Sequence, residues 1–80
     1  MAVKLVFLGK LADLAGAPEQ DLAGPLDWSG LLAGLPAPLA AAVQGEKVKL
    51  AVNATLLADK TALAATDGDE VALLPPVSGG

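Results

Sequence analysis

Apolar residues alternate with other residues in three short stretches of the chain, with the period of two that is typical of β-strands. The stretches are Val3–Leu8, Lys47–Val52 and Glu70–Leu74. In strands, one face would carry the apolar side chains of Val3, Leu5, Phe7, Val48, Leu50, Val52, Val71 and Leu73. Such a face needs a cover, so the pattern predicts a sheet that packs against helices on one side.

Another stretch has the three- and four-residue spacing of a helix face. It is Lys10–Gly16, in which Leu11, Leu14 and Ala15 would lie together. Gly16 is a typical C-terminal residue for such a helix, because glycine adopts the left-handed conformation at little cost. The sequence therefore predicts a short helix directly after the first strand.

A second helix is predicted after Asp27, whose carboxylate can accept hydrogen bonds from the free amides of a first turn. The apolar face of this helix would consist of Trp28, Leu31, Leu32 and Leu35. Pro36 and Pro38 should interrupt it, because proline lacks an amide and clashes with the preceding turn. Leu39–Val43 would then form a separate helical piece.

The remaining segments predict a weak edge strand and tight turns. The edge strand is Gln20–Ala23, and Asn53-Ala54 suits a turn before a short return strand at Thr55–Ala58. Asp67–Asp69 reads as a second sharp turn, whose acidic side chains, with Glu70, we interpret as solvated and not as a metal site. The order of strand, helix, weak strand, helix and three further strands favours an α+β fold with a mixed sheet.

The amino-acid composition excludes several classes of function. The 80 residues carry a net charge of −4 and include five lysines, no arginine, no histidine and no cysteine. This balance argues against nucleic-acid binding, and it leaves no thiol nucleophile and no soft metal ligand. We expect no bound metal or cofactor. We also expect a cytoplasmic protein, since the N-terminal apolar stretch is too short and too quickly followed by charge for a signal peptide. The longest apolar stretch contains two prolines and is too short to span a bilayer.

The chain ends in PPVSGG, residues 75–80. A frayed end is the simplest interpretation of such a sequence. However, two prolines favour an extended path away from the domain, and terminal glycines without side chains can enter a narrow channel. We therefore expect one domain at residues 1–74 and an extended, flexible tail at residues 75–80.

Three segments resemble the MoaD/ThiS family of sulfur carrier proteins, and most of all the small subunit of molybdopterin synthase. They are Asp67–Gly80 (DGDEVALLPPVSGG), Ala51–Leu57 (AVNATLL) and Phe7–Gly16 (FLGKLADLAG). The resemblance implies a β-grasp, ubiquitin-like fold. It also implies that an E1-like activating enzyme uses ATP to adenylate the carboxylate of Gly80, and that a sulfur donor then displaces AMP to leave a thiocarboxylate.

The same resemblance implies the partners. The carrier would not be catalytic alone, but would donate sulfur to a cyclic pterin precursor in the large subunit of molybdopterin synthase, in a heterotetramer. The sulfur donor would be a protein such as a cysteine desulfurase or a rhodanese-like protein. Gly79 would give the tail clearance in the partner's channel. The residues expected to contact partners are Leu8, Leu57, Leu74, Pro75, Pro76, Val77 and Ser78.

Three alternatives remain open from the sequence. The chain could carry sulfur for thiamine thiazole synthesis or for tRNA thiolation. It could be a ubiquitin-like modifier that is attached to lysines through Gly80. It could also be a plain binding domain with an inert tail.

Overall fold

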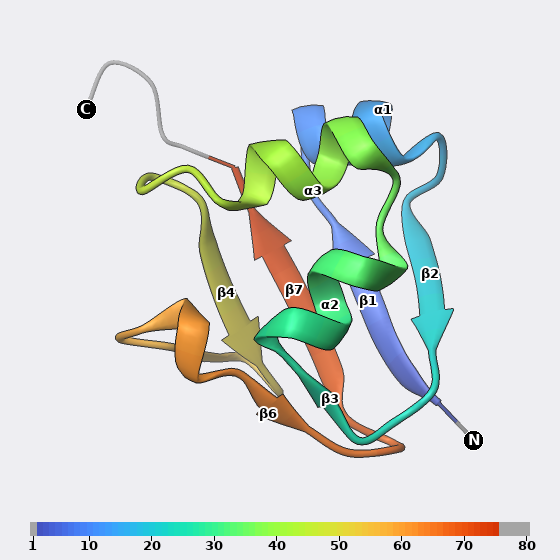
Figure 1. The fold of residues 1–80 in the computed structure, drawn as a ribbon, viewed down its shortest axis with the longest axis vertical. Helices are drawn as coiled ribbons and strands as arrows, with labels where there is room; N and C mark the ends of the chain where they lie inside the picture. Colours follow the sequence, from blue (N-terminus) through green and yellow to red (C-terminus); the bar gives the residue numbers. More distant parts are fainter. Residues whose placement is uncertain (1, 76–80) are drawn as a thin grey trace.

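The computed structural model describes residues 2–75, so Pro76, Val77, Ser78, Gly79 and Gly80 lie outside the described residues. It contains a five-stranded sheet with the strand order β2-β1-β7-β4-β5 (Figure 1). The strands are β1 (Val3–Phe7), β2 (Glu19–Leu22), β4 (Lys49–Val52), β5 (Thr55–Leu56) and β7 (Glu70–Leu74). The central pair, β1 and β7, is parallel, whereas the other neighbours are antiparallel. The predicted α+β, β-grasp fold is confirmed.

Three helices cover one face of this sheet (Figure 1). They are α1 (Lys10–Ala15), α2 (Trp28–Gly34) and α3 (Ala37–Val43). The core between the two layers is apolar, and its fully buried large side chains are Val3, Leu5, Leu31, Leu39, Val43, Leu50, Val71 and Leu73. The alternation in the sequence thus identified the strand face that the helices cover, and Phe7 is buried in the same core.

The helix ends follow the local rules. Asp27 caps α2, where its carboxylate accepts a hydrogen bond from the Gly30 amide at 2.7 Å. Gly16 ends α1 in the left-handed conformation, with φ of 76°. The extended backbone of Leu35 ends α2, and α3 starts at Ala37. Pro38 is tolerated in the first turn of α3, because an amide at this position has no hydrogen-bond partner within the helix.

The pattern did not show a second, two-stranded sheet made of β3 (Leu26–Asp27) and β6 (Ala64–Ala65). It also missed a short 3₁₀ helix, η1 (Lys60–Ala62). Two-residue strands are too short to produce a hydrophobic period, so only the folded chain identifies them. Within residues 2–75, the structure contains no helix with the length and hydrophobicity that a bilayer crossing requires.

The turn between β4 and β5 packs against the turn that precedes β7. Asn53 and Ala54 both have positive φ, 50° and 70°, which a tight hairpin turn requires. The Asn53 side chain donates to the Asp69 carboxylate at 3.0 Å, and its oxygen accepts from the Glu70 amide at 3.0 Å. Asn53 is therefore a turn residue that also joins the two turns.

Candidate functional site

The C-terminal end of β7 is where the tail leaves the domain. Because β1 and β7 are parallel, they end at the same edge of the sheet, with Phe7 opposite Leu73. The Leu8 amide donates to the Leu73 carbonyl at 3.3 Å, and Pro75 then offers no amide to either neighbouring strand. The tail therefore starts from the middle of the sheet, flanked on one side by the end of β1 and on the other by the start of β4.

The face of the sheet away from the helices is open at this edge. Residues paired across strands point to the same face, and Lys49 pairs with Leu74 while Ala51 pairs with Leu56. Leu8 and Leu56 are 40% and 59% exposed, and Leu74 is half-buried. Ala51 also belongs to this face, although it is buried, because paired residues flank it on both sides.

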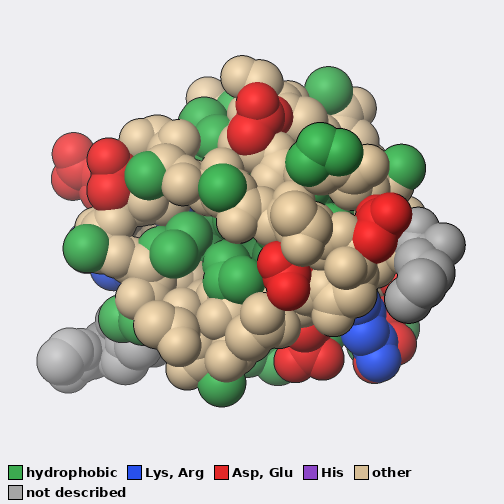
Figure 2. All heavy atoms as spheres, turned by 90° about the horizontal axis from the view of Figure 1, so that it is seen from below, with side chains coloured by type: hydrophobic (Ala, Val, Ile, Leu, Met, Phe, Trp, Pro, Cys, Tyr) green, Lys and Arg blue, Asp and Glu red, His purple; other side chains and the backbone are tan. Residues whose placement is uncertain are grey.

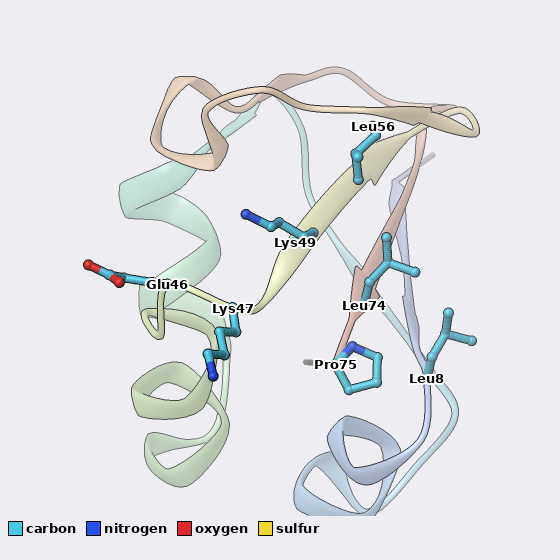
Figure 3. Close-up of a pocket in the computed structure, with 7 residues that line it drawn as sticks. All are labelled: Leu8, Glu46, Lys47, Lys49, Leu56, Leu74 and Pro75. Carbon is cyan, nitrogen blue, oxygen red and sulfur yellow. The ribbon is translucent and has the colours of Figure 1, made fainter. Parts of the chain in front are cut away.

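These side chains border a hollow of about 930 Å³ beside the start of the tail (Figure 3). Its lining residues are Leu8, Glu46, Lys47, Lys49, Leu56, Leu74 and Pro75. Figure 3 shows that Leu8, Leu74 and Pro75 lie next to one another, with the lysines and Glu46 toward the other side. We call this set of residues the tail-base hollow. An apolar surface that is rimmed by polar residues is typical of a protein interaction site.

The tail-base hollow differs in charge from the rest of the chain. Its lining contains two lysines and one glutamate, whereas the whole chain has a net charge of −4. Among residues 2–75, Lys47 and Lys49 form no ion pair, and the pair that is present is an exposed one between Lys4 and Glu19 at 3.4 Å. At the end of the molecule seen in Figure 2, acidic side chains are spread over the surface. The hollow therefore favours a partner with acidic groups around an apolar contact.

Lys60, which does not line the hollow, stabilises the 45–48 loop at its rim. The Lys60 ammonium donates to the Gly45 carbonyl and, at 2.9 Å, to the Val48 carbonyl. It also lies 5.9 Å from the centre of the Trp28 ring. Partial burial, and then the nearby positive charge of Lys49, lower the pKa of Lys60. These contacts fix the 45–48 loop, which carries Glu46 and Lys47 on the rim of the hollow.

The structure brings together only some of the residues expected to contact partners. Leu8, Leu74 and Pro75 line the hollow, whereas Leu57 packs against the core and lines a different, smaller hollow. The Leu57 amide pairs with the Leu50 carbonyl, and the register of β4 and β5 places Leu56 on the open face instead. The sequence interpretation missed Leu56, because the register of so short a hairpin is set by its turn and not by a hydrophobic pattern.

Gly9 is a second residue that the sequence interpretation missed. It lies between β1 and α1 with φ of 56° and ψ of −129°. A Cβ atom at this position would lie 3.3 Å from Cγ of Pro75. The glycine that follows the first strand was the available signal, because a glycine directly before a helix often marks a special backbone conformation.

A comparison of the sequence with protein-family models identifies the family of this chain. The ThiS family model matches residues 5–80, nearly the whole chain. The chain belongs to the ThiS family. This confirms the resemblance to the MoaD/ThiS sulfur carriers. A comparison with curated protein sequences found no match.

Solved structures share the fold of this ThiS-family chain. One is the small archaeal modifier protein 1 from Methanosarcina acetivorans, with 24% identity over 98% of this chain and 95% of that one, and a TM-score of 0.75. A putative molybdopterin converting factor subunit 1 from Pyrococcus furiosus has 24% identity over 96% and 99% of the two chains, with a TM-score of 0.68. A complex of subunits 1 and 2 of molybdopterin-converting factor from Helicobacter pylori has 24% identity over 100% of both chains, with a TM-score of 0.60.

Proposed function

We propose that this ThiS-family protein is the sulfur carrier subunit of a molybdopterin synthase. The observation that supports this most is the family match, which runs through the tail to Gly80. The fold adds support, since it releases the tail from the centre of the sheet beside an apolar hollow. The Helicobacter pylori neighbour was solved as a complex of two molybdopterin-converting factor subunits, which makes a large subunit the first partner to test.

In the proposed reaction, the Gly80 carboxylate is the reacting group. A carboxylate is a poor acyl donor, and its conversion to an acyl adenylate by an activating enzyme provides AMP as a leaving group. The outer sulfur of a persulfide donor attacks the acyl carbon and displaces AMP. A thiol then reduces the acyl disulfide that results and leaves a thiocarboxylate, from which the sulfur passes to a cyclic pterin precursor. Gly79 takes part by its lack of a side chain, which lets the tail enter the narrow channels of two enzymes.

The tail-base hollow is the proposed docking surface for these partners. Leu8, Leu56 and Leu74 provide apolar area that water covers in the free protein, and its burial favours association. Pro75 borders this surface and starts the tail, so a partner that covers the hollow also receives the tail. From Pro75 to Gly80 the tail spans at most about 20 Å, which limits how far from the hollow the partner's catalytic centre can lie.

The same surface can serve the activating enzyme and the large subunit only in turn, because both must receive the same tail. We therefore propose sequential complexes, in which the loaded carrier leaves the activating enzyme before it joins the large subunit. Two carriers on a dimer of large subunits would form the heterotetramer.

The test is the intact mass of the protein after incubation with an activating enzyme, ATP and a sulfur donor, with alkylation of any thiocarboxylate. We expect one oxygen atom to be replaced by sulfur at Gly80, and we expect no replacement in a Gly80 deletion. Addition of the large subunit and the cyclic pterin precursor should then return the carboxylate and yield the dithiolene. An unmodified mass under these conditions would refute the sulfur-carrier function.

A ubiquitin-like modifier is the second candidate, because a small archaeal modifier protein is among the structural neighbours. Such a protein would use the same adenylate but would form an isopeptide bond with a lysine. The two functions differ in their products, so mass spectrometry of lysates separates them. Gly80 remnants on lysines of other proteins would favour the modifier, and a thiocarboxylate consumed only with the pterin precursor would favour the synthase subunit. Thiazole or tRNA thiolation would show as consumption with those acceptors instead.

A further inference from the structure

Two backbone features meet where the tail begins. Gly9 lies two residues after Phe7, and Pro75 lies two residues after Leu73, in the parallel pair that matches Phe7 with Leu73. The strands have ended at both positions, yet the two residues remain neighbours. The missing Cβ of Gly9 would stand 3.3 Å from Cγ and 4.0 Å from Cβ of Pro75.

Gly9 is suited to this position for two separate reasons. Its φ of 56° with ψ of −129° lies outside the conformations that residues with a side chain adopt readily. It also leaves space for the Pro75 ring, which cannot rotate away because it is closed onto its own backbone nitrogen. A methyl group at position 9 requires Cγ of Pro75 to shift by a few tenths of an ångström. A flexible side chain at position 75 could rotate away, whereas proline can give way only through its ring pucker or its backbone.

We infer that Gly9 is a positioning residue for the tail: its bare backbone supports the Pro75 ring and so sets the direction in which the tail leaves the sheet. This inference rests on the proposed function, because direction matters only if the tail works in a partner. The five residues beyond Pro75 reach at most about 17 Å, so a change of direction at Pro75 shifts the region that the tip of the tail can reach.

Gly16 offers a matched control. It ends the same helix that Gly9 precedes, it also has positive φ, at 76°, and a Cβ there would meet nothing within 4 Å. Gly16→Ala therefore strains the backbone and weakens α1 without touching Pro75. Gly9→Ala adds a tight contact with the proline ring to a larger backbone strain, because φ of 56° with ψ of −129° suits a side chain less than the left-handed conformation of Gly16. The double variant Gly9→Ala/Pro75→Ala keeps that strain and removes the ring, so it is the control for strain at position 9.

The first experiment reads the direction of the tail without any sulfur chemistry. The chain has no cysteine, so one cysteine added after Gly80 takes a single spin label. Paramagnetic broadening of amide signals around the tail-base hollow, such as those of Leu8, Lys49 and Leu56, then reports where the label spends its time. We expect the same pattern for the unchanged protein and Gly16→Ala, a different pattern for Gly9→Ala, and a return toward the original in the double variant.

The second experiment measures sulfur transfer from preloaded carriers to the precursor in the large subunit. We expect Gly9→Ala to bind the large subunit within about threefold of the unchanged protein but to transfer sulfur about tenfold more slowly, because misplacement of reacting groups costs rate more than affinity. The double variant should recover most of the rate. Gly16→Ala should transfer normally at temperatures where it is folded.

The outcomes separate the inference from the proposed function. If the unchanged protein transfers no sulfur, the proposed function fails, and the broadening pattern still decides whether Gly9 directs the tail. If Gly9→Ala gives the same broadening pattern as Gly16→Ala, the inference is overturned. Should Gly9→Ala not fold, Pro75→Gly removes the ring from the same contact, and an unchanged pattern in that variant would overturn it as well.

Discussion

The two ends of β7 are built in different ways. At its start, the 67–69 turn is held by side-chain hydrogen bonds: Asp69 accepts from the Thr66 amide at 2.9 Å and from Asn53, and Asp67 accepts from the Gly24 amide at 2.8 Å. At its other end, Leu74 and Pro75 border an apolar hollow that is open to solvent. The polar groups at the start of β7 form hydrogen bonds within the protein, whereas the end of β7 leaves apolar surface exposed to solvent.

This difference separates stability from interaction along one strand. The hydrogen bonds at the start hold the turn that leads into β7, and the register of β7 with β1 and β4 places the strand's other end. The apolar end contributes less to the fold, because part of its surface remains in water. Substitutions at the turn should therefore change the free energy of unfolding, whereas substitutions at the hollow or in the tail should change the interactions with partners.

The largest effect is expected beyond the hollow, in the tail. Deletion of Gly80 should abolish loading with sulfur, and Gly79→Val should lower its rate at least about 100-fold, because a branched side chain would collide with the channel walls of the activating enzyme. Ser78→Ala is the comparison at the neighbouring position and should lower the loading rate far less than Gly79→Val, because it removes a hydroxyl group and adds no bulk. Intact mass over time measures loading, and thermal unfolding should be unchanged in all three variants.

The hollow itself should show the next largest effect. Leu8→Asp should weaken the complex with the large subunit about 10- to 100-fold, because it places an unpaired charge within a buried apolar contact. Leu14→Asp is the control, since Leu14 is 41% exposed, as Leu8 is at 40%, but does not line the hollow. Calorimetric titration measures both affinities. Equal losses in the two variants would show that the hollow is not the docking surface.

Substitution in the β4–β5 turn should lower the stability of the protein and leave its affinity for the large subunit nearly unchanged. Asn53→Ala removes two hydrogen bonds and places alanine at a φ of 50°, so we expect a loss of about 1–2 kcal/mol in the free energy of unfolding. Affinity for the large subunit should stay within about twofold at temperatures where the variant is folded. Urea unfolding with calorimetric titration tests this. A large loss of affinity without a loss of stability would contradict the division of β7 into two ends.

The smallest effect is a pH dependence at the same turn. The Thr66 amide and then the Asn53 side chain lower the pKa of Asp69 from 3.8, since they donate to its charged form. The pKa of Asp69 is thus lower in the folded protein than in the unfolded chain. Its carboxylate therefore contributes fully to the free energy of unfolding above the unfolded-state pKa, and this stabilisation is lost as pH falls through the folded-state pKa. Urea unfolding of the unchanged protein and of Asp69→Asn should differ near neutral pH and converge below about pH 3.8.

The sequence predicted the long elements well and the site in part. A hydrophobic period extends over the five residues of β1 and of β7, and Asp27 and Gly16 carry the local signals of helix ends. Leu8, Leu74 and Pro75 could be placed together, because the first and last strands of a β-grasp sheet are neighbours. Leu56 could not be assigned to the same surface from the sequence. A shift of one residue in the register of the β4–β5 hairpin decides whether Leu56 or Leu57 lies on the open face of the sheet.

By itself, the sequence determined the strand and helix faces, the breaks at proline and the family resemblance that extends to the terminal glycines. These properties depend on side chains that are close in the chain or on its order. Only the tertiary structure decided that Leu56 joins the tail-base hollow, that Asn53 joins two turns, and that Gly9 lies beside Pro75, 66 positions away in the sequence. Each of these is a contact between distant segments, and strand register brings such segments together without leaving a local pattern.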